Sequence, residues 1–179
     1  MEENARLRQE VERLRNEALT DPLTGLPNRR SLDALLAAEI SRALRSRAPL
    51  AVMCIDVDNF KRVNDTWGHQ KGDEVLVWVA RFLRSQIRGH DIAGRLGGDE
   101  FVVVLPGTDK AGADILADRL RATLEQLRGG MDHPVGLSVG VAALDLASKD
   151  VTPEGLLERA DNAMYRQKGR TKRMARVPR

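Results

Sequence analysis

Cysteine and long apolar runs are what this 179-residue sequence most plainly lacks. Its single cysteine, Cys54, cannot form an internal disulfide, and nothing in the chain requires an oxidising compartment. No apolar stretch approaches the roughly 18 residues that a membrane-spanning helix needs, and the charged N-terminus is unlike a signal peptide. We therefore expect a soluble chain without membrane contact, of a length that suits one domain and a short extension.

Aromatic residues are also scarce, at 3% of the chain, although the C-terminus is rich in positive charge. Basic tails often bind nucleic acid or anionic membranes. However, 29 Lys and Arg against 26 Asp and Glu leave a net charge of only +3, and no aromatic stacking platform is present. These features argue against a nucleic-acid partner. The basic residues of the C-terminus are Arg166, Lys168, Arg170, Lys172, Arg173, Arg176 and Arg179.

Two adjacent carboxylates behind two glycines form the most informative motif, Gly97-Gly98-Asp99-Glu100-Phe101. Residues 91–96 and 101–105 are both typical of strands, which places the motif at the bend of a hairpin. Glycine there permits a positive φ and a close approach of another molecule to the backbone. An ordinary solvated turn has a similar composition, so the motif alone leaves a structural and a functional interpretation open.

A second pair of acids follows the continuous apolar run at residues 50–55, which predicts a buried strand that ends in Asp56-Val57-Asp58. Hard divalent ions prefer oxygen ligands and often bridge carboxylates to substrate phosphates. Asp56 and Asp99 could supply such a pair, whereas a single Asp is as readily explained as a helix cap. Cys54 lies inside the predicted strand and is expected to be a core residue rather than a nucleophile.

The remaining pattern predicts helices that alternate with short strands. Helices are expected over residues 28–47, 70–88, 110–128 and 152–167, the last of which begins at Thr152-Pro153-Glu154, and a further strand over 135–143. Helices combined with an antiparallel hairpin indicate an α+β fold, in which helices pack on a sheet.

The first 19 residues differ in kind, because Leu7, Val11, Leu14 and Ala18 recur at the spacing of a coiled-coil seam. About two heptads are present, fewer than a firm coiled-coil prediction needs. Two interpretations stay open: a dimer seam, or a solvated amphipathic helix that lies on its own domain.

Several motifs together give the chain a family resemblance. It resembles the GGDEF domains, diguanylate cyclases that join two GTP molecules into cyclic di-GMP. Beside residues 97–101, the matching segments are residues 21–30, 56–69, 72–73, 138–142 and 160–165, in the family's order. The resemblance implies a mostly antiparallel sheet of the nucleotidyl cyclase type, with a ferredoxin-like core, in a bacterial cytoplasmic protein. It divides the chain into a signalling helix (1–19), a GGDEF domain (20–173) and a basic tail (174–179), with an upstream sensor absent.

The resemblance also implies a catalytic centre. Asp56 and Asp99, with the backbone carbonyl of Val57, would bind one or two Mg²⁺ or Mn²⁺ ions. Glu100 would be a further metal ligand or the base that takes the 3′-hydroxyl proton, and the sequence does not separate these roles. Lys61 is expected to join Asp99 and Glu100 among the catalytic residues.

Substrate contacts follow from the same resemblance. Guanine would be recognised by Asn64 and Asp73, because a carboxylate can accept from the two donors that adenine lacks. The remaining contacts, to phosphate and the hairpin, are expected at Asn59, Phe60, Lys61, Gly97, Gly98, Lys168 and Lys172. Lys172 stands where the family places an arginine, so the phosphate contact there is altered, with Arg170 and Arg173 as candidate substitutes.

The resemblance also implies a site at which the product inhibits the enzyme. Arg88-Gly89-His90-Asp91 is similar to the RxxD site at which many of these cyclases bind cyclic di-GMP as an inhibitor, with Arg119 as a secondary contact. A surface ion pair is the alternative. The family further implies a homodimer in which each subunit brings one GTP. The second functional class is a catalytically inactive domain that only binds GTP or cyclic di-GMP and passes on a signal. In such domains the GGDEF motif is usually degraded, whereas residues 97–101 of this chain keep it intact.

Overall fold

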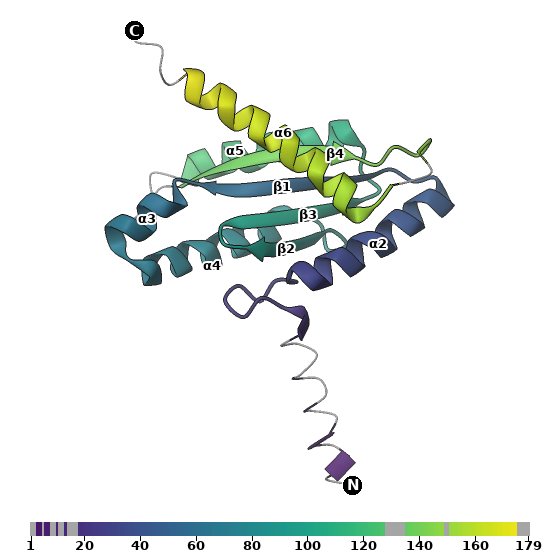
Figure 1. Ribbon diagram of the computed structural model, residues 1–179, viewed down its shortest axis with the longest axis horizontal. Helices are drawn as coiled ribbons and strands as arrows, with labels where there is room; N and C mark the ends of the chain where they lie inside the picture. Colours follow the sequence, from purple (N-terminus) through teal and green to yellow (C-terminus); the bar gives the residue numbers. More distant parts are fainter. Residues whose placement is uncertain are drawn as a thin grey trace.

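The computed structural model describes residues 3–4, 6–7, 10, 13, 18–127, 135–148 and 151–174, with side chains up to residue 168 (Figure 1). The fold consists of a sheet flanked by helices. Its elements are α2 (Arg29–Ser46), β1 (Leu50–Asp58), α3 (Phe60–Trp67), α4 (His69–Gln86), β2 (Ile92–Gly97), β3 (Glu100–Pro106), α5 (Lys110–Leu127), β4 (Gly136–Ala143) and α6 (Pro153–Met174).

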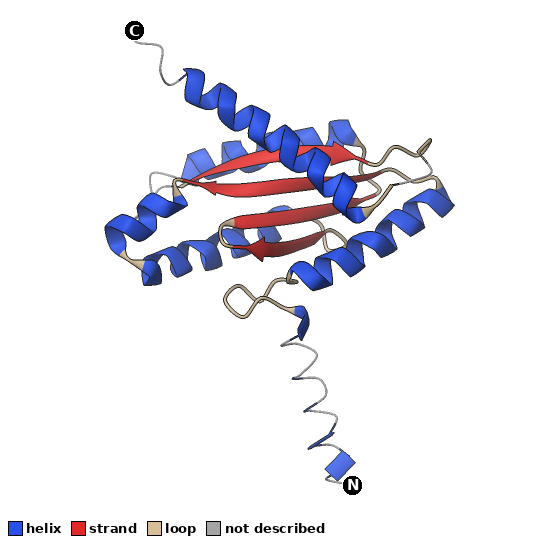
Figure 2. Ribbon diagram, viewed as in Figure 1, coloured by secondary structure: helices blue, strands red, loops and turns tan. Residues whose placement is uncertain are grey.

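The four strands form one antiparallel sheet in the order β2-β3-β1-β4, shown in red in Figure 2. The predicted α+β fold with an antiparallel sheet is therefore confirmed. The central strand β1 pairs with β3 on one side and with β4 on the other. In this register Asp56 lies opposite Glu100 on β3 and opposite Ser138 on β4.

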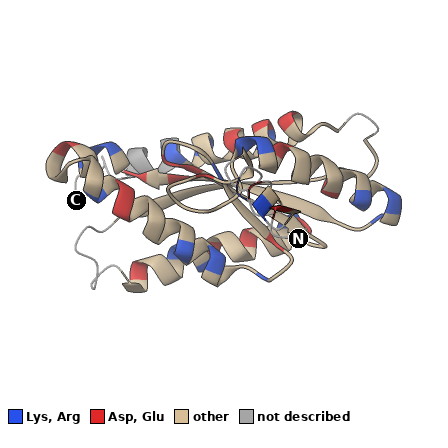
Figure 3. Ribbon diagram, turned by 90° about the horizontal axis from the view of Figure 1, so that it is seen from below, with Lys and Arg blue, Asp and Glu red and all other residues tan. Residues whose placement is uncertain are grey.

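Helices cover both faces of the sheet. Successive strand residues point to opposite faces, so the apolar strands give each face a core of its own. Met53 and Val103 belong to the core beneath α4 and α5, whereas Val52 and Val104 belong to the core beneath α2 and α6. The same separation is visible in Figure 1, where α2 and α6 cross in front of the sheet and α4 and α5 lie behind it. The outer surfaces of the helices carry Lys and Arg interspersed with Asp and Glu (Figure 3).

Cys54 points into the core on the α2 and α6 side and is 5% exposed. Its Sγ lies 3.6 Å from the carbonyl oxygen of Leu157 on α6, to which it donates. Burial, followed by repulsion from Asp161 and Glu100, raises the pKa of the thiol to about 12. A protonated, enclosed thiol is a packing residue, as the sequence predicts.

Most predicted element boundaries agree with the structure to within two residues. The start of α2 is one such case, since the Asn28 side chain accepts from the Ser31 N–H at 3.0 Å and caps the helix. The predicted end of the last helix at residue 167 is wrong, because α6 continues to Met174. A glycine such as Gly169 costs a helix only about 1 kcal/mol relative to alanine, and the Arg, Lys and Met residues around it are good helix formers.

The helix α3 has no counterpart in the sequence prediction. It begins after Asn59, whose φ is 61°, and ends at Gly68, whose φ is 85°. These two residues of positive φ separate α3 from β1 and from α4. Residues 59–68 therefore form a short helical cap beside the carboxyl end of β1.

The proposed coiled-coil seam remains a prediction. Val11 and Leu14 lie outside the described residues, and of the other two positions Leu7 is 57% exposed and Ala18 is exposed as well. No helix among the described residues is both long and apolar enough to cross a membrane.

Candidate functional site

The carboxylates predicted from two distant parts of the sequence lie at the same end of the sheet. Asp56 occupies the end of β1, opposite Glu100 at the start of β3. Asp99 sits in the hairpin turn, where its carbonyl oxygen accepts from the Val57 N–H at 3.2 Å. This backbone contact ties the glycine turn, in which Gly98 has a φ of 51°, directly to β1.

A lysine from the last helix completes this cluster. The Lys168 Nζ lies 2.5 Å from Oδ1 of Asp56, with the two side chains 29% and 16% exposed. The cluster opens into a cavity of about 530 Å³. The residues that line the cavity are Asp56, Val57, Asp58, Asn59, Phe60, Lys61, Asp99, Arg121, Leu137, Ser138, Gln167 and Lys168.

Two acidic side chains at the site, those of Asp99 and Glu100, have a pKa above the ordinary value. Burial is the main cause of the raised pKa of Asp99, and the charge of Asp56 is the second. The pKa of Glu100 is also raised, first by burial and then by Asp161, Asp56 and Asp99. A cation placed here would relieve the repulsion that, after burial, raises the pKa values of Asp99 and Glu100.

The oxygen donors suit a hard divalent ion, although the protein side chains alone do not enclose one. Within the described ranges, no three His, Cys, Asp or Glu side chains are arranged to hold a metal ion. Asp56, Asp99 and the backbone carbonyl of Val57 supply oxygen ligands, and Mg²⁺ commonly takes one or two carboxylates together with substrate phosphates. The Lys168 ammonium at Asp56 already marks this position as one that attracts a positive charge.

Asn64 and Asp73 lie outside the carboxylate cavity, on the neighbouring helices α3 and α4. Oδ1 of Asn64 is buried and has no hydrogen-bond partner among the described residues. Gly72 makes room for it, since a Cβ there would lie 1.9 Å from that oxygen. Asp73, the next residue of α4, is exposed. A buried amide oxygen without a partner is costly, so Oδ1 of Asn64 is available to a hydrogen-bond donor from outside the described protein atoms.

Arg88, Asp91 and Arg119 come together on the surface beside the start of β2. The Arg88 N–H donates to Asp91 Oδ2 at 2.8 Å, and the Arg119 guanidinium donates to the carbonyl oxygen of Gln86. Asp91 Oδ1 is buried without a hydrogen-bond partner in the described part of the chain, and the His90 Nε2 lies 3.6 Å from it. The side chains of Arg170, Lys172 and Arg173 lie outside the described residues.

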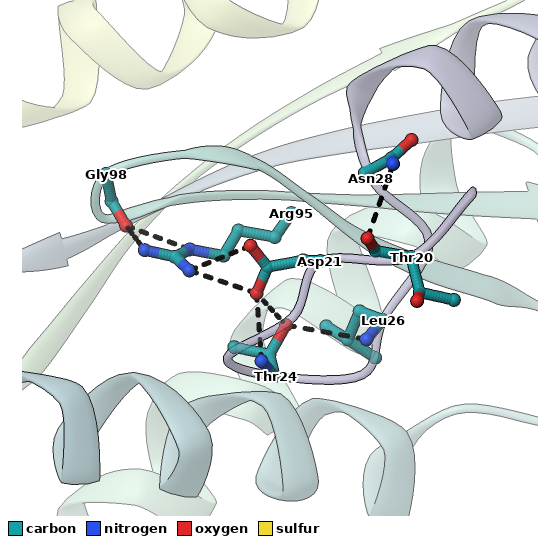
Figure 4. Close-up of polar contacts among 7 residues, drawn as sticks. All are labelled: Thr20, Asp21, Thr24, Leu26, Asn28, Arg95 and Gly98. Carbon is teal, nitrogen blue, oxygen red and sulfur yellow. Dashed lines mark hydrogen bonds and ion pairs between the residues drawn. The ribbon is translucent and has the colours of Figure 1, made fainter. Parts of the chain in front are cut away.

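Sequence reasoning missed Arg95, which connects the opening turn of the domain to the glycine turn (Figure 4). Its Nη1 donates to both carboxylate oxygens of Asp21 at 3.0 Å. Its Nε and Nη2 donate to the carbonyl oxygen of Gly98 at 3.1 and 2.7 Å. The Arg95 and Asp21 side chains are only 12% and 18% exposed. The one available signal is an arginine inside a strand, two residues before the glycines.

Asp21 is held by further bonds within its own turn. Its Oδ1 accepts from the Thr24 N–H at 2.9 Å and from the Thr24 hydroxyl at 2.6 Å. Burial would raise the pKa of Asp21, but the hydrogen bonds from Thr24 and Arg95 outweigh it and hold the pKa below its usual value. The Asn28 side chain donates to the carbonyl oxygens of Ala18 and Thr20, at 2.9 and 3.3 Å. The opening turn is thus fastened at both ends.

Comparison with known proteins agrees with this arrangement. The family described as "Diguanylate cyclase, GGDEF domain" matches residues 18–174. The chain is 40% identical over 172 residues to diguanylate cyclase DgcP of Pseudomonas aeruginosa, a match covering 94% of this chain and 25% of DgcP. It is 42% identical over 156 residues to response regulator PleD of Caulobacter vibrioides, covering 84% of this chain and 34% of PleD. The chain thus spans only a quarter to a third of these relatives.

Solved structures give the same result. The coiled coil and GGDEF domain of DgcB from Caulobacter crescentus, in complex with c-di-GMP, has a TM-score of 0.83 and 30% identity, over 93% of this chain and 88% of that one. The active GGEEF domain of a diguanylate cyclase from Vibrio cholerae has a TM-score of 0.71 and 38% identity, over 80% and 91% of the two chains. The likeness therefore extends over the sheet and its flanking helices.

Proposed function

This chain belongs to the GGDEF domain family, and we propose that it is a diguanylate cyclase that condenses two GTP molecules into cyclic di-GMP with release of two pyrophosphates. The observation that carries the proposal is the meeting of Asp56, Asp99 and Lys168 at one cavity, from a strand, a hairpin and a helix. Relatives named diguanylate cyclases at about 40% identity support it.

Asp56, Asp99 and the Val57 carbonyl would hold one or two Mg²⁺ or Mn²⁺ ions in this proposal. When bound, the ion supplies a Lewis acid that neutralises charge on the α-phosphate and favours ionisation of the attacking 3′-hydroxyl. The Lys168 Nζ lies 2.5 Å from Asp56 Oδ1, and in this proposal the ammonium binds a phosphate oxygen of GTP.

Phosphate binding is assigned to the cations and amides at the cavity wall. Lys61 is exposed and lines the cavity with Lys168. The backbone amides of Asn59 and Phe60 lie at the start of α3, where N–H groups without helical partners favour an anion. Gly97 and Gly98 let a phosphate approach the hairpin closely, and Lys172 follows one turn of α6 beyond Lys168.

Glu100 is assigned to the 3′-hydroxyl, either as the base that takes its proton or as a further ligand to the ion. Guanine recognition is assigned to Asn64 and Asp73. The Asp73 carboxylate can accept from guanine N1–H and its exocyclic amine, whereas adenine would leave it unpaired. The buried, unpaired Oδ1 of Asn64 supports a ligand donor at this place.

The remaining parts of the proposal concern assembly and regulation. Closing the product ring requires two GTP molecules, so we assign the activity to a homodimer with one GTP on each subunit. Arg88, Asp91 and Arg119 would bind cyclic di-GMP and inhibit the enzyme. The solved DgcB structure in complex with c-di-GMP supports product binding in this family. Residues 1–19 would link the catalytic domain to an upstream sensor.

Incubation of the purified chain with GTP and Mg²⁺, followed by chromatographic separation of the nucleotides, tests the activity. The expected result is cyclic di-GMP and pyrophosphate in a ratio of one to two, with none from ATP. Asp56→Asn serves as the inactive control. Absence of cyclic di-GMP at high protein concentration, with product continuously removed, would contradict the proposal.

A further inference from the structure

Arg121 lies where three elements meet at one end of the cavity, and the proposed function gives it no role. Its Nη1 donates to Oδ1 of Asp118 on the same helix at 2.7 Å. Its Nη2 reaches away from α5 and donates to the Val139 carbonyl of β4 at 3.1 Å and to Oε1 of Gln167 on α6 at 2.8 Å. One guanidinium group thus joins α5, the outer strand of the sheet and α6.

Gln167 immediately precedes Lys168, whose ammonium lies at Asp56. Successive residues of a helix are turned by about 100°, so Gln167 can face α5 while Lys168 faces the carboxylates. A rotation of α6 about its axis that withdrew Lys168 from Asp56 would also separate Gln167 from Arg121. The two contacts therefore hold the same rotational position of α6.

The hydrogen bond between Arg121 and Gln167 lies toward the C-terminal part of α6. One turn earlier, α6 packs closely on β4 at Gly140, where a Cβ would lie 2.1 Å from the Ala160 carbonyl oxygen and 2.2 Å from the Met164 nitrogen. The C-terminal part of α6 runs on past the sheet (Figure 1). A planar guanidinium can hold the Val139 and Gln167 oxygens in a fixed geometry, which a lysine ammonium on a flexible stem cannot.

We infer that Arg121 is a positioning residue for substrate binding: by holding Gln167, it fixes the turn of α6 that carries Lys168 above Asp56. The inference rests on the proposed function, in which Lys168 binds a phosphate of GTP. Three oxygen acceptors already engage the guanidinium, which favours this bracing role over a direct bond from Arg121 to phosphate.

The test compares Arg121→Ala, Gln167→Ala and the double variant. Affinity for a non-hydrolysable GTP analogue is measured by calorimetry with Mg²⁺ present, and KM and kcat are measured with GTP. Each single variant should weaken analogue affinity and raise KM about fivefold to tenfold, with kcat changed less than about twofold. The double variant should match the single variants, because both break the same hydrogen bond. Arg121→Lys should resemble Arg121→Ala.

Arg159→Ala is the matched control, since Arg159 is an exposed cation of α6 that lines the adjoining groove between α5, β4 and α6. It should leave analogue affinity unchanged. Additive losses in the double variant, or a normal Gln167→Ala beside a weakened Arg121→Ala, would overturn the bracing role in favour of direct phosphate contact. Unchanged affinity in all variants would overturn it altogether.

The set of variants distinguishes a loss of folding from a loss of the contact between Arg121 and Gln167. Gln167→Ala leaves the bonds from Arg121 to Asp118 and Val139 in place, so it tests the brace even if Arg121→Ala lowers the melting temperature. Analogue binding requires no turnover. A wild-type chain that binds the analogue but makes no cyclic di-GMP would refute the proposed function and leave the comparison of variants intact.

Discussion

At the scale of single residues, the site concentrates negative charge at a place that the folded chain does not neutralise fully. Asp99 and Glu100 have raised pKa values because they are partly buried and face other acids. The single cation in contact with this group among the described side chains of α6 is Lys168, at Asp56. Such a site favours ligands that bring cations with them, as a metal-bound nucleotide does.

Glu100→Gln tests which of two assigned roles Glu100 has, base or ligand to the metal ion. Because the amide neither takes a proton nor binds a divalent ion well, turnover should fall by about 10²–10⁴-fold, while the fold is retained. Pyrophosphate release gives the rate, and Mg²⁺ titration of analogue binding separates the two roles. Unchanged metal dependence of binding would assign Glu100 to proton transfer, and weakened dependence would assign it to the ion. Turnover within tenfold of wild type would contradict both.

Asp73→Asn tests guanine selectivity. The amide keeps the shape of the side chain but presents only one acceptor oxygen, so the preference for GTP over ATP should fall by about tenfold or more. Competition of ATP against a fluorescent GTP analogue measures the preference directly. Asp65→Asn, an exposed acid of α3, is the control and should leave it unchanged. An unaltered preference in Asp73→Asn would remove this residue from the guanine site.

At the scale of elements, the hairpin that carries the acids is held from outside by the opening turn of the domain. Arg95 links Asp21 to the Gly98 carbonyl, and its backbone N–H donates to the Pro27 carbonyl at 2.9 Å. The position of the glycine turn therefore depends on residues more than seventy positions earlier in the chain. Removing either partner leaves the other charge partly buried and unpaired.

Asp21→Asn should lower the free energy of unfolding by about 1–3 kcal/mol at pH 7. Because the pKa of Asp21 is lowered on folding, its contribution is complete above the unfolded pKa of about 3.9 and is lost as pH falls through the lower folded value. Urea unfolding of wild type and variant at pH 7, 5 and 3 measures the difference. A difference that does not shrink at pH 3 would show that the ion pair is not its source.

How far the sequence predicts the structure depends on whether the signal is local. The strands and the start of α2 follow from neighbouring residues, such as the apolar run before Asp56, and the predicted helix at 28–47 begins in the structure at Arg29. The helix α3 was not predicted, because the residue before it, Asn59, has a left-handed backbone and makes no side-chain capping hydrogen bond. Arg95 and Arg121 were missed because their partners are distant in sequence, and only the folded chain brings them together.

At the scale of the whole molecule, two candidate sites lie on different parts of one sheet. The carboxylate cavity is at the carboxyl end of β1, whereas Arg88, Asp91 and Arg119 gather between the end of α4, β2 and α5. A ligand at the second place does not compete directly for the first. Cyclic di-GMP bound at Arg88, Asp91 and Arg119 would inhibit the enzyme by changing how two subunits are arranged, and not by blocking the carboxylate cavity.

Arg88→Ala should therefore relieve inhibition by cyclic di-GMP without changing the initial rate before product accumulates. Progress curves with added cyclic di-GMP measure the inhibition constant, which should rise by at least about tenfold when a charged hydrogen-bonding partner is lost. Arg84→Ala, an exposed cation in the last turn of α4, is the matched control. Unchanged inhibition in Arg88→Ala would leave the RxxD motif as a surface feature.

The most direct test of the central claim is the rate of cyclic di-GMP formation from GTP and Mg²⁺ as a function of protein concentration. A site that needs one GTP from each of two subunits predicts cyclic di-GMP as the product, with a specific activity that rises with concentration and saturates as the dimer forms. Asp56→Asn at the same concentrations should give none. Absence of cyclic di-GMP from the wild-type chain at every concentration would contradict the account.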